Sequence, residues 1–437
     1  MDDVSRAIDI IRFPINQEQT VSNLHDDPLL QLYYRNFHAS HPFLPPFEFL
    51  TSALARDIPP FLLSIMRAIG AQYGQDTSLV ARLRHSTAPS RSSHDSPIDR
   101  GFQVQYLLLT SIIEHAHGHN EYSHHALAEA ITLALELGMN EPSFSHENSL
   151  GFCVLEESWR RTYWELYVVN GFIAATRNLD TFTLHEVDCN LMLPCDENEY
   201  QTAGAISPQP TLEELHKSSI LLDERQLSSF AYRIRAVHIL GLVLSLHSEG
   251  NINTEMELET INAYITGLYF EIPPPRRELY GVDGKVDEMI FQTLIVLHMS
   301  TVYLHHPLGN IRLASPQRRI SCSQIQQSQQ TQTNLCGPPV PDIHSRKVMD
   351  AVDSVLNMVT ISRSIKQTTP FFMCAIVVSI IVQITSGLAS GKDPKLKERS
   401  LAKIRLGLGA LKVLSELWPL AKLSKDELVN LCQAAAI

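Results

Sequence analysis

The hydrophobic positions of this chain recur at helical spacing along much of its length. Between residues 152 and 173, apolar side chains alternate at steps of three and four, which places them on one face of an α-helix. These apolar positions are Phe152, Leu155, Trp159, Tyr163, Leu166, Val169 and Ile173. A regular series of alternating strands joined by Asn-Gly or Asp-Gly turns is not found in the sequence. The pattern predicts an all-α fold of many helices of moderate length, without a fixed repeat.

Residues that favour helix ends divide this pattern. Asp27 before Pro28 predicts a helix start, and Gly138 predicts a helix end. Two further starts are predicted by Ser/Thr-x-x-Glu capping boxes, at residues 211–214 and 424–427.

The composition is that of a large folded protein. The chain has 437 residues, of which 44% are hydrophobic, enough to bury a sizeable core. Its formal net charge of -12 has the wrong sign for binding nucleic acid through the overall field, so any DNA contact needs a local basic patch. The one cluster of basic residues is interrupted by Asp393 and Glu398 and is interpreted as a solvated helix face. It consists of Lys392, Lys395, Lys397, Arg399, Lys403 and Arg405.

The seven cysteines are scattered along the chain and form no C-x-x-C pair. We therefore expect neither a disulfide framework nor a zinc ribbon. The first residues show no basic segment followed by an apolar one, so a secretory signal is not expected and a reducing intracellular compartment is the default.

One apolar stretch, residues 370–388, is long enough to suggest a membrane span. We interpret it as a buried core helix, because it contains polar residues that are costly in lipid. Thr369 and Pro370 are expected to cap its start and Gly387 to end it. A buried strand is the alternative, and it ranks above a membrane span.

Segments poor in apolar residues separate the predicted helices. They are residues 84–100, 203–210 and 316–341, and the last is rich in Gln and Ser and ends in Pro. The predicted organisation is an N-terminal arm (1–26), a core (27–310), a disordered loop (311–345) and C-terminal helices that complete the same domain (346–437).

The sequence offers little that suggests catalysis. No nucleophile elbow, P-loop, dinucleotide fingerprint or H-E-x-x-H motif is found, and Asp26-Asp27 is interpreted as a helix cap rather than a magnesium site. We therefore predict no enzyme, no cofactor and no metal. Histidines are concentrated in one segment, where we interpret them as part of a solvated connection between helices rather than as a metal site. A second group of histidines is likewise not interpreted as a metal site. The first group is His115, His117, His119, His124 and His125, and the second is His298, His305 and His306.

Four segments together resemble the regulatory middle domain of fungal zinc binuclear cluster transcription factors. Residues 29–45 are similar to the opening helix of that family and its His-Pro entry, and residues 126–138 are similar to its helix of small residues ending in Leu-Gly. Residues 157–167 match the Arg-Arg-x-x-Trp helix, and residues 187–194 match the following Asp-x-x-x-Leu-Pro segment. The resemblance covers most of the chain, roughly residues 27–431.

The sequence departs from the family at several positions. Asn170-Gly171 stands where the family usually has Asp-Arg, and residues 176–178 replace its Gly-Arg-Pro. The family's DNA-binding head holds two zinc ions with six closely spaced cysteines, whereas the first cysteine here is Cys153. The expectation is a regulator without its own zinc cluster, either from a gene model that lacks its start or as a headless co-regulator.

The resemblance implies a transcription regulator that controls secondary-metabolite or nutrient-use genes. It also implies nuclear location, with cytoplasmic location left open, and contact with the transcription machinery or a DNA-binding partner. DNA would then be contacted only indirectly, a small-molecule effector is left open, and no membrane is expected. A helical enzyme and a cytoplasmic ligand-binding or scaffold module are the alternatives.

Three residues of the Trp/Arg helix are singled out: Arg160, Arg161 and Trp164. A structural role is expected for each, with Trp164 buried beside Tyr163. The arginine pair is interpreted as a solvated or salt-bridged helix face, since Glu157 and Glu165 lie four residues on either side of Arg161.

Overall fold

The computed structural model describes twelve segments of the chain. They are residues 24–76, 78–80, 83, 96–202, 206–217, 227–246, 255–279, 286–311, 319–324, 342–361, 364–389 and 394–435. The α-helices are α1 (Pro28–Asn36), α2 (Pro60–Tyr73), α4 (Pro97–His117), α5 (Asn120–Glu136), α6 (Pro142–Glu147), α7 (Cys153–Arg177), α8 (Glu197–Thr202), α9 (Leu212–Lys217), α10 (Ser229–Leu246), α11 (Glu255–Glu271), α12 (Pro274–Arg277), α13 (Glu288–His305), α14 (Ile343–Met358), α15 (Phe372–Ala389), α16 (Pro394–Leu414) and α17 (Pro419–Ala434).

Short elements connect these helices. The 3-10 helices are η1 (Leu24–Asp26), η2 (His38–Ser40), η3 (Phe47–Thr51), η4 (Ala53–Arg56), η5 (Thr183–His185), η6 (His306–Leu308) and η8 (Ile365–Gln367). Two residues of β1 (Arg319–Ile320) pair antiparallel with two of β2 (Ser323–Gln324), which makes a small hairpin. The predicted all-α fold is confirmed, with this β1–β2 hairpin as a minor addition.

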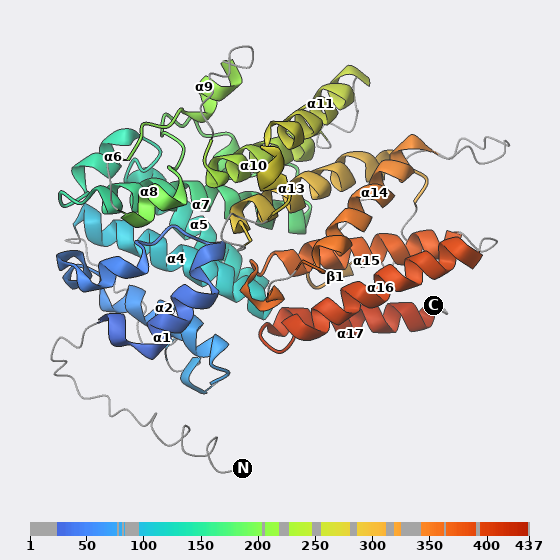
Figure 1. Ribbon diagram of the computed structural model, residues 1–437, viewed down its shortest axis with the longest axis horizontal. Helices are drawn as coiled ribbons and strands as arrows, with labels where there is room; N and C mark the ends of the chain where they lie inside the picture. Colours follow the sequence, from blue (N-terminus) through green and yellow to red (C-terminus); the bar gives the residue numbers. More distant parts are fainter. Residues whose placement is uncertain are drawn as a thin grey trace, which may run out of the picture.

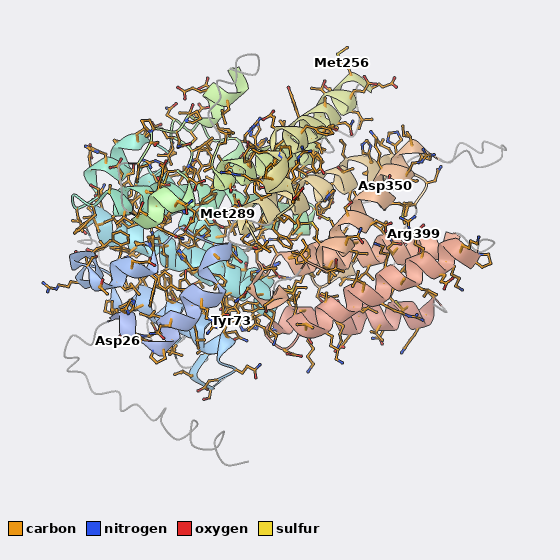
Figure 2. All side chains as sticks on the ribbon, in the orientation of Figure 1. Asp26, Tyr73, Met256, Met289, Asp350 and Arg399 are labelled. Atoms are coloured by element: carbon orange, nitrogen blue, oxygen red, sulfur yellow. A yellow bond between two sulfur atoms is a disulfide. The ribbon has the colours of Figure 1, made fainter. Side chains whose placement is uncertain are left out.

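The helices pack around one continuous core. Figure 1 shows α1, α2 and α4 gathered on one side of the molecule and α15, α16 and α17 on the other, with α10 and α13 between them. Helix α17 contacts α4, so the C-terminal part of the chain packs against the N-terminal part. Figure 2 shows Met289 at the centre of this assembly, where it is buried, and Met256 at the outer end of α11, where it is 74% exposed.

Local capping explains many helix boundaries. The Asp27 carboxylate accepts a hydrogen bond from Leu29 N at 2.9 Å and caps α1, with Pro28 as its first residue. The predicted box at residues 211–214 forms in both directions and begins α9. Gly138 follows α5 with φ of 69°, a left-handed conformation that favours glycine.

The predicted start at Ser424 is wrong. Helix α17 already begins at Pro419 and runs through Ser424, whose buried hydroxyl has no hydrogen-bond partner. Glu427, predicted to close the box, instead accepts hydrogen bonds from Ser321 in the β1–β2 hairpin. Pro419 determines the start because proline suits the first turn of a helix.

The apolar stretch near residue 380 is a buried core helix, as predicted. Helix α15 starts at Phe372, two residues after the expected Pro370, and continues past Gly387 to Ala389. Among the described helices, α10 is long and apolar enough to cross a membrane by length and composition, but 67% of it is buried inside the molecule. Helices α15 and α10 are therefore both helices of the packed core.

Two predicted linkers are partly structured. Helix α4 begins at Pro97, so the end of the 84–100 segment is helical, while residues 84–95 lie outside the described part of the chain. Within the predicted loop 311–345, the β1–β2 hairpin is packed on the core and α14 begins at Ile343. The remaining positions of that loop between 312 and 341 lie outside the described residues. Of the predicted arm, residues 24–26 form η1, and residues 1–23 lie outside the description.

Candidate functional site

Helix α7 carries the most specific motif and lies at the centre of the core. The sequence predicts a solvated or salt-bridged helix face; the predicted ion pair between Glu157 and Arg161 forms, but the expected exposure to solvent is wrong. Glu157, Arg160, Arg161 and Glu165 are all buried, because other elements of the chain cover α7 on every side. Burying a charge is costly unless it is paired and hydrogen-bonded, so each of these side chains needs specific partners.

Arg161 has partners on three sides. Its Nε donates to Glu157 Oε1 at 3.0 Å, and its Nη1 donates to Glu197 Oε2 at 2.6 Å. The guanidinium also donates to the backbone carbonyls of Pro42 and Cys195, each at 3.1 Å. Burial alone would lower the pKa of Arg161, but Glu197 and Glu157 outweigh it and raise this pKa, so the side chain stays charged.

Arg160 completes the first half of this network. Its guanidinium pairs with the buried carboxylate of Glu157 and, at 3.3 Å, with Glu156. Glu157 also accepts a hydrogen bond from Cys195 N at 2.9 Å. The two neighbouring arginines therefore share one carboxylate and fix the backbone that precedes α8.

Glu165 forms the second half with Arg233 from α10. Both side chains are fully buried, and the Arg233 guanidinium pairs with the Glu165 carboxylate. Arg233 Nη1 also donates to Gln292 Oε1 in α13 at 2.9 Å. Burial alone would raise the pKa of Glu165, but Arg233 and then His41 outweigh it and lower this pKa below its ordinary value.

His41 connects the opening segment to this pair. Its Nδ1 lies 2.8 Å from Glu165 Oε1, and its Nε2 lies 3.2 Å from the hydroxyl of Thr369. Burial lowers the pKa of His41 despite the neighbouring carboxylate. Because a carboxylate can only accept, the neutral ring carries its hydrogen on Nδ1 and accepts from Thr369 through Nε2.

Trp164 lies two turns after Glu157 on α7 and packs against the same following segment of the chain. The indole is 1% exposed, and its Nε1 donates to the carbonyl of Met192 at 2.9 Å. Its ring meets Tyr163 and Tyr167 edge to face, with centroids 5.6 Å apart in both pairs. The backbone of Met192 pairs with that of Thr211 in an isolated antiparallel β-bridge. Trp164 therefore fixes the segment that follows η5.

The buried network joins elements that are far apart in the sequence. His41, Glu197 and Arg233 were not singled out from the sequence, although each holds one of the α7 charges. The presence of Arg233 and Arg235 within the largely apolar segment 229–246 was the one signal that could have pointed to Arg233. Since these groups bind one another and backbone carbonyls, their arrangement suits holding segments together rather than chemistry on a substrate.

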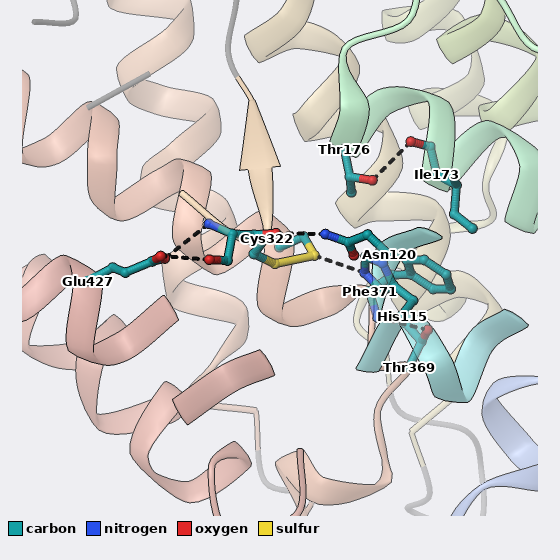
Figure 3. Close-up of a disulfide and its surroundings, with 10 residues drawn as sticks. His115, Asn120, Ile173, Thr176, Cys322, Thr369, Phe371 and Glu427 are labelled. Atoms are coloured by element: carbon teal, nitrogen blue, oxygen red, sulfur yellow. Dashed lines mark hydrogen bonds between the residues drawn. A yellow bond between two sulfur atoms is a disulfide. The ribbon is translucent and has the colours of Figure 1, made fainter. Parts of the chain in front are cut away.

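A polar cavity of about 320 Å³ lies away from this network, between α4, α5, α7, α17 and the β1–β2 hairpin. His115 and Cys322 line its inner part, and the exposed Arg177 and Glu121 stand where it meets the surface. Figure 3 shows His115, Thr176, Cys322 and Glu427 around this region. Cys322 is bonded to Cys374 of α15 in a single disulfide, which the expectation of no disulfide framework did not include.

The crowded histidines do not form a single solvated turn. His115 is buried against Phe371, whereas His119 is exposed and lies 2.7 Å from Glu114. His305 and His306 of the second group are also buried. Within the described residues, no group of three or more His, Cys, Asp or Glu side chains is arranged to hold a metal ion.

The basic cluster near residue 400 has the predicted solvated character. Lys395, Lys397, Arg399 and Arg405 are exposed along α16, and Arg399 pairs with Asp353 of α14. The other side of α16 buries Leu411 and Leu414 in the core.

Comparison with known proteins identifies the family. Residues 30–260, just over half of the chain, match the fungal specific transcription factor domain. A relative from Pestalotiopsis fici, the C6 finger domain transcription factor iacK, is 28% identical over 404 residues, which cover 92% of this chain. The chain spans 58% of the length of that relative. No solved structure matches the chain.

The matched region agrees with the resemblance seen in the sequence. It contains the opening helix α1, the Trp/Arg helix α7 and the α10 helix that carries Arg233. The core network between these helices therefore lies largely within the family domain. The chain belongs to the family of proteins that contain a fungal specific transcription factor domain.

Proposed function

We propose that this chain acts as the regulatory part of a fungal transcription regulator. The observation that carries the proposal is the match of residues 30–260 to the fungal specific transcription factor domain. A relative named as a C6 finger domain transcription factor supports it along most of the chain. The family and this name indicate a transcription factor rather than an enzyme.

DNA recognition is proposed to be indirect for these 437 residues. Their seven cysteines begin at Cys153 and include no run of six closely spaced ones, and the net charge is -12. Protein partners from the transcription machinery, or a DNA-binding partner, would then bring the chain to its target genes. We propose the nucleus as its location and a secondary-metabolite or nutrient-use gene set as its target.

The test of this function is transcript sequencing after deletion of the gene in its fungus. We expect a restricted set of genes to change, including neighbouring biosynthetic or nutrient-use genes, and a fluorescent fusion to accumulate in nuclei. Re-expression of the chain should restore these transcripts. Unchanged transcripts under every nutrient condition tested, together with cytoplasmic fluorescence, would reject the proposal.

We also propose that residues 27–310 and 346–437 form one regulatory domain. The support is packing: α17 contacts α4, α15 contacts α13, and α14 contacts both α13 and α15. Within this domain Arg160, Arg161 and Trp164 are proposed to have structural roles. Each is buried, Arg160 pairs with Glu157 on its own helix, and Arg161 and Trp164 bind other segments of the chain. Separate expression of the two parts should give unfolded fragments.

A small-molecule effector is the second candidate function, and the polar cavity favours it. Its volume of about 320 Å³ is at the lower end of the range typical of ligand pockets, about 300–1,000 Å³. Arg177 and His124 would offer hydrogen bonds to a small polar molecule. A thermal-shift screen with small carboxylic acids and sugars tests this, and a hit should disappear in Arg177→Ala but persist in Arg405→Ala, which changes an exposed arginine of α16.

A further inference from the structure

The Cys322–Cys374 disulfide joins the β1–β2 hairpin to the core. Cys322 lies in the turn between β1 and β2, and Cys374 lies in the first turn of α15, with their Cα atoms 5.5 Å apart. Both residues are buried, at 3% exposure each. Figure 3 shows the bond between the hairpin and the helix, close to His115 and Phe371.

The two cysteines face different surroundings. Cys322 lines the polar cavity that reaches the surface at Glu121 and Arg177. Cys374 instead lines a smaller apolar cavity of about 60 Å³, together with Phe371 and other hydrophobic residues. The polar cavity therefore offers a water-soluble thiol a route to Cys322 rather than to Cys374.

His115 is placed beside the other sulfur. Its Nε2 lies 3.4 Å from Cys374 Sγ, and its ring is stacked on Phe371 with centroids 4.6 Å apart. Burial, with a smaller effect of His124, lowers the pKa of His115 to about 4, so the ring is neutral at pH 7. A neutral ring with hydrogen on Nε2 can donate to the sulfur of Cys374 and stabilise it as a leaving thiolate.

Hydrogen bonds and apolar packing also hold the described residues of the hairpin. Glu427 of α17 accepts hydrogen bonds from Ser321 N at 3.0 Å and Ser321 Oγ at 2.6 Å, and Asn120 donates to Ser321 O at 3.4 Å. Ile320 adds one buried apolar side chain. Without the covalent bond, the attachment of the described hairpin residues rests on these contacts and on the packing of β2 against α7 and α15.

We propose that the Cys322–Cys374 disulfide is a redox modification site, reversibly reduced by a small thiol that enters through the polar cavity, and that reduction loosens the β1–β2 hairpin. The thiolate of the small thiol attacks Cys322 Sγ, the Cys322–Cys374 bond breaks, and Cys374 takes the electron pair and then a proton. A second thiol attacks the mixed disulfide and releases Cys322. Two thiols become one disulfide, and the two cysteines gain two electrons and two protons.

If the chain is in the nucleus, a reducing compartment, this disulfide would be formed and reduced reversibly in the cell. Disulfides in reducing compartments are usually transient, with catalytic or redox-sensing roles. This biological use rests on the proposed nuclear location, whereas the chemistry at Cys322 does not. A test with the purified chain therefore separates failure of the redox site from failure of the proposed function.

The test equilibrates the purified chain in mixtures of reduced and oxidised glutathione. Free thiols are then alkylated and the Cys322–Cys374 peptide is quantified by mass spectrometry. The equilibrium depends on the squared concentration of reduced glutathione divided by the concentration of oxidised glutathione. We expect this disulfide to pass from mostly oxidised to mostly reduced as that quotient rises by about 100-fold. Cysteines that stay free in oxidised glutathione alone, or a disulfide that persists in reduced glutathione alone, would overturn the proposal.

Hydrogen exchange measures the structural consequence. Backbone amides of residues 319–324 should exchange at least about tenfold faster in the reduced chain, while those of α10 stay unchanged. Cys322→Ser should show the fast exchange in both buffers, and Cys153→Ser, which changes an exposed cysteine outside the disulfide, should behave as the unsubstituted chain does. Equal exchange in the oxidised and reduced chain would show that the bond does not control the hairpin. Because the primary comparison uses the unsubstituted chain, it stands even if a variant fails to fold.

Discussion

Removing the charge of Glu165 is the sharpest test of the buried network. Glu165→Gln keeps the size of the side chain but leaves the Arg233 guanidinium without its ion-pair partner, in a position that is fully buried. The new amide group also has two donors, and at least one of them would face either Arg233 or the Nδ1 hydrogen of His41. Donor would then face donor where the native chain has a charge-assisted hydrogen bond.

The expected loss of unfolding free energy follows from the burial of the Glu165 and Arg233 side chains. Removing one partner of a buried ion pair costs about 3–5 kcal/mol of unfolding free energy, because the other charge remains buried and uncompensated. Arg233→Met should cost a similar amount. The double variant should cost at least about 2 kcal/mol less than the sum of the single variants, because it removes both charges together.

Lowering the pH should narrow the difference in unfolding free energy between Glu165→Gln and the native chain. The pKa of Glu165 in the folded chain is lowered from its ordinary value of 4.5. Its contribution to stability is therefore complete above that value and is lost as the pH falls through the lower folded pKa. Once the pH is below this folded pKa, the protonated glutamic acid resembles glutamine, so the two unfolding free energies should converge as the pH falls from 4.5 through that pKa.

Denaturant unfolding followed by circular dichroism measures these free energies. Arg235→Met is the matched control, because Arg235 lies on the same helix, is only partly buried and pairs with the exposed Glu271. Such a surface pair contributes about 0–1 kcal/mol. If Glu165→Gln and Arg233→Met cost no more than Arg235→Met, the buried ion pair does not stabilise the fold and the reasoning fails.

Three further predictions concern single positions. Trp164→Ala should cost about 3–5 kcal/mol, because it empties a buried aromatic site, and an unchanged melting temperature would place Trp164 on a surface instead. Gly70→Ala should cost at least about 2 kcal/mol in denaturant unfolding, because the added Cβ would overlap the carbonyl oxygen of Leu29 where α1 crosses α2; a soluble variant with native stability would contradict this close approach. Cys322→Ser should lower stability by up to about 4 kcal/mol in oxidising buffer, since the bond to Cys374 closes a loop of 52 residues, and should have much less effect with reductant present; equal losses in the two buffers would argue against the disulfide.

Local signals in the sequence were sufficient for much of the fold. Asp27, Gly138 and the Thr211 capping box act on neighbouring backbone groups, so their effects could be predicted without knowing the tertiary structure. Ser424 shows the limit of this reasoning. Its pattern satisfies the same rule, but Pro419 starts α17 more than one turn earlier, and Glu427 is used by the hairpin instead.

The burial of the α7 charges could not be predicted from the sequence. The spacing of Glu157, Arg161 and Glu165 suggests a ladder on an exposed face, because i to i+4 pairs are common there. Their burial depends on partners such as Arg233, 68 residues beyond Glu165, and His41, 124 residues before it. Which distant residues meet is decided by packing of the whole chain.

The disulfide was missed for a related reason. Seven scattered cysteines do not reveal which of them meet, and Cys322 lies in a segment whose composition suggested a mobile loop. The hairpin around it becomes ordered by contacts with α7, α15 and α17, all of which are distant in sequence.

Tethering to DNA tests the proposed regulatory function most directly. The chain is fused to an unrelated DNA-binding domain in a fungal cell, and transcription of a reporter with the matching sites is measured. We predict that the fusion raises or lowers reporter transcription relative to the DNA-binding domain alone, that Arg233→Met abolishes this effect, and that Arg235→Met preserves it. A folded fusion that occupies the sites and leaves reporter transcription unchanged would contradict the account.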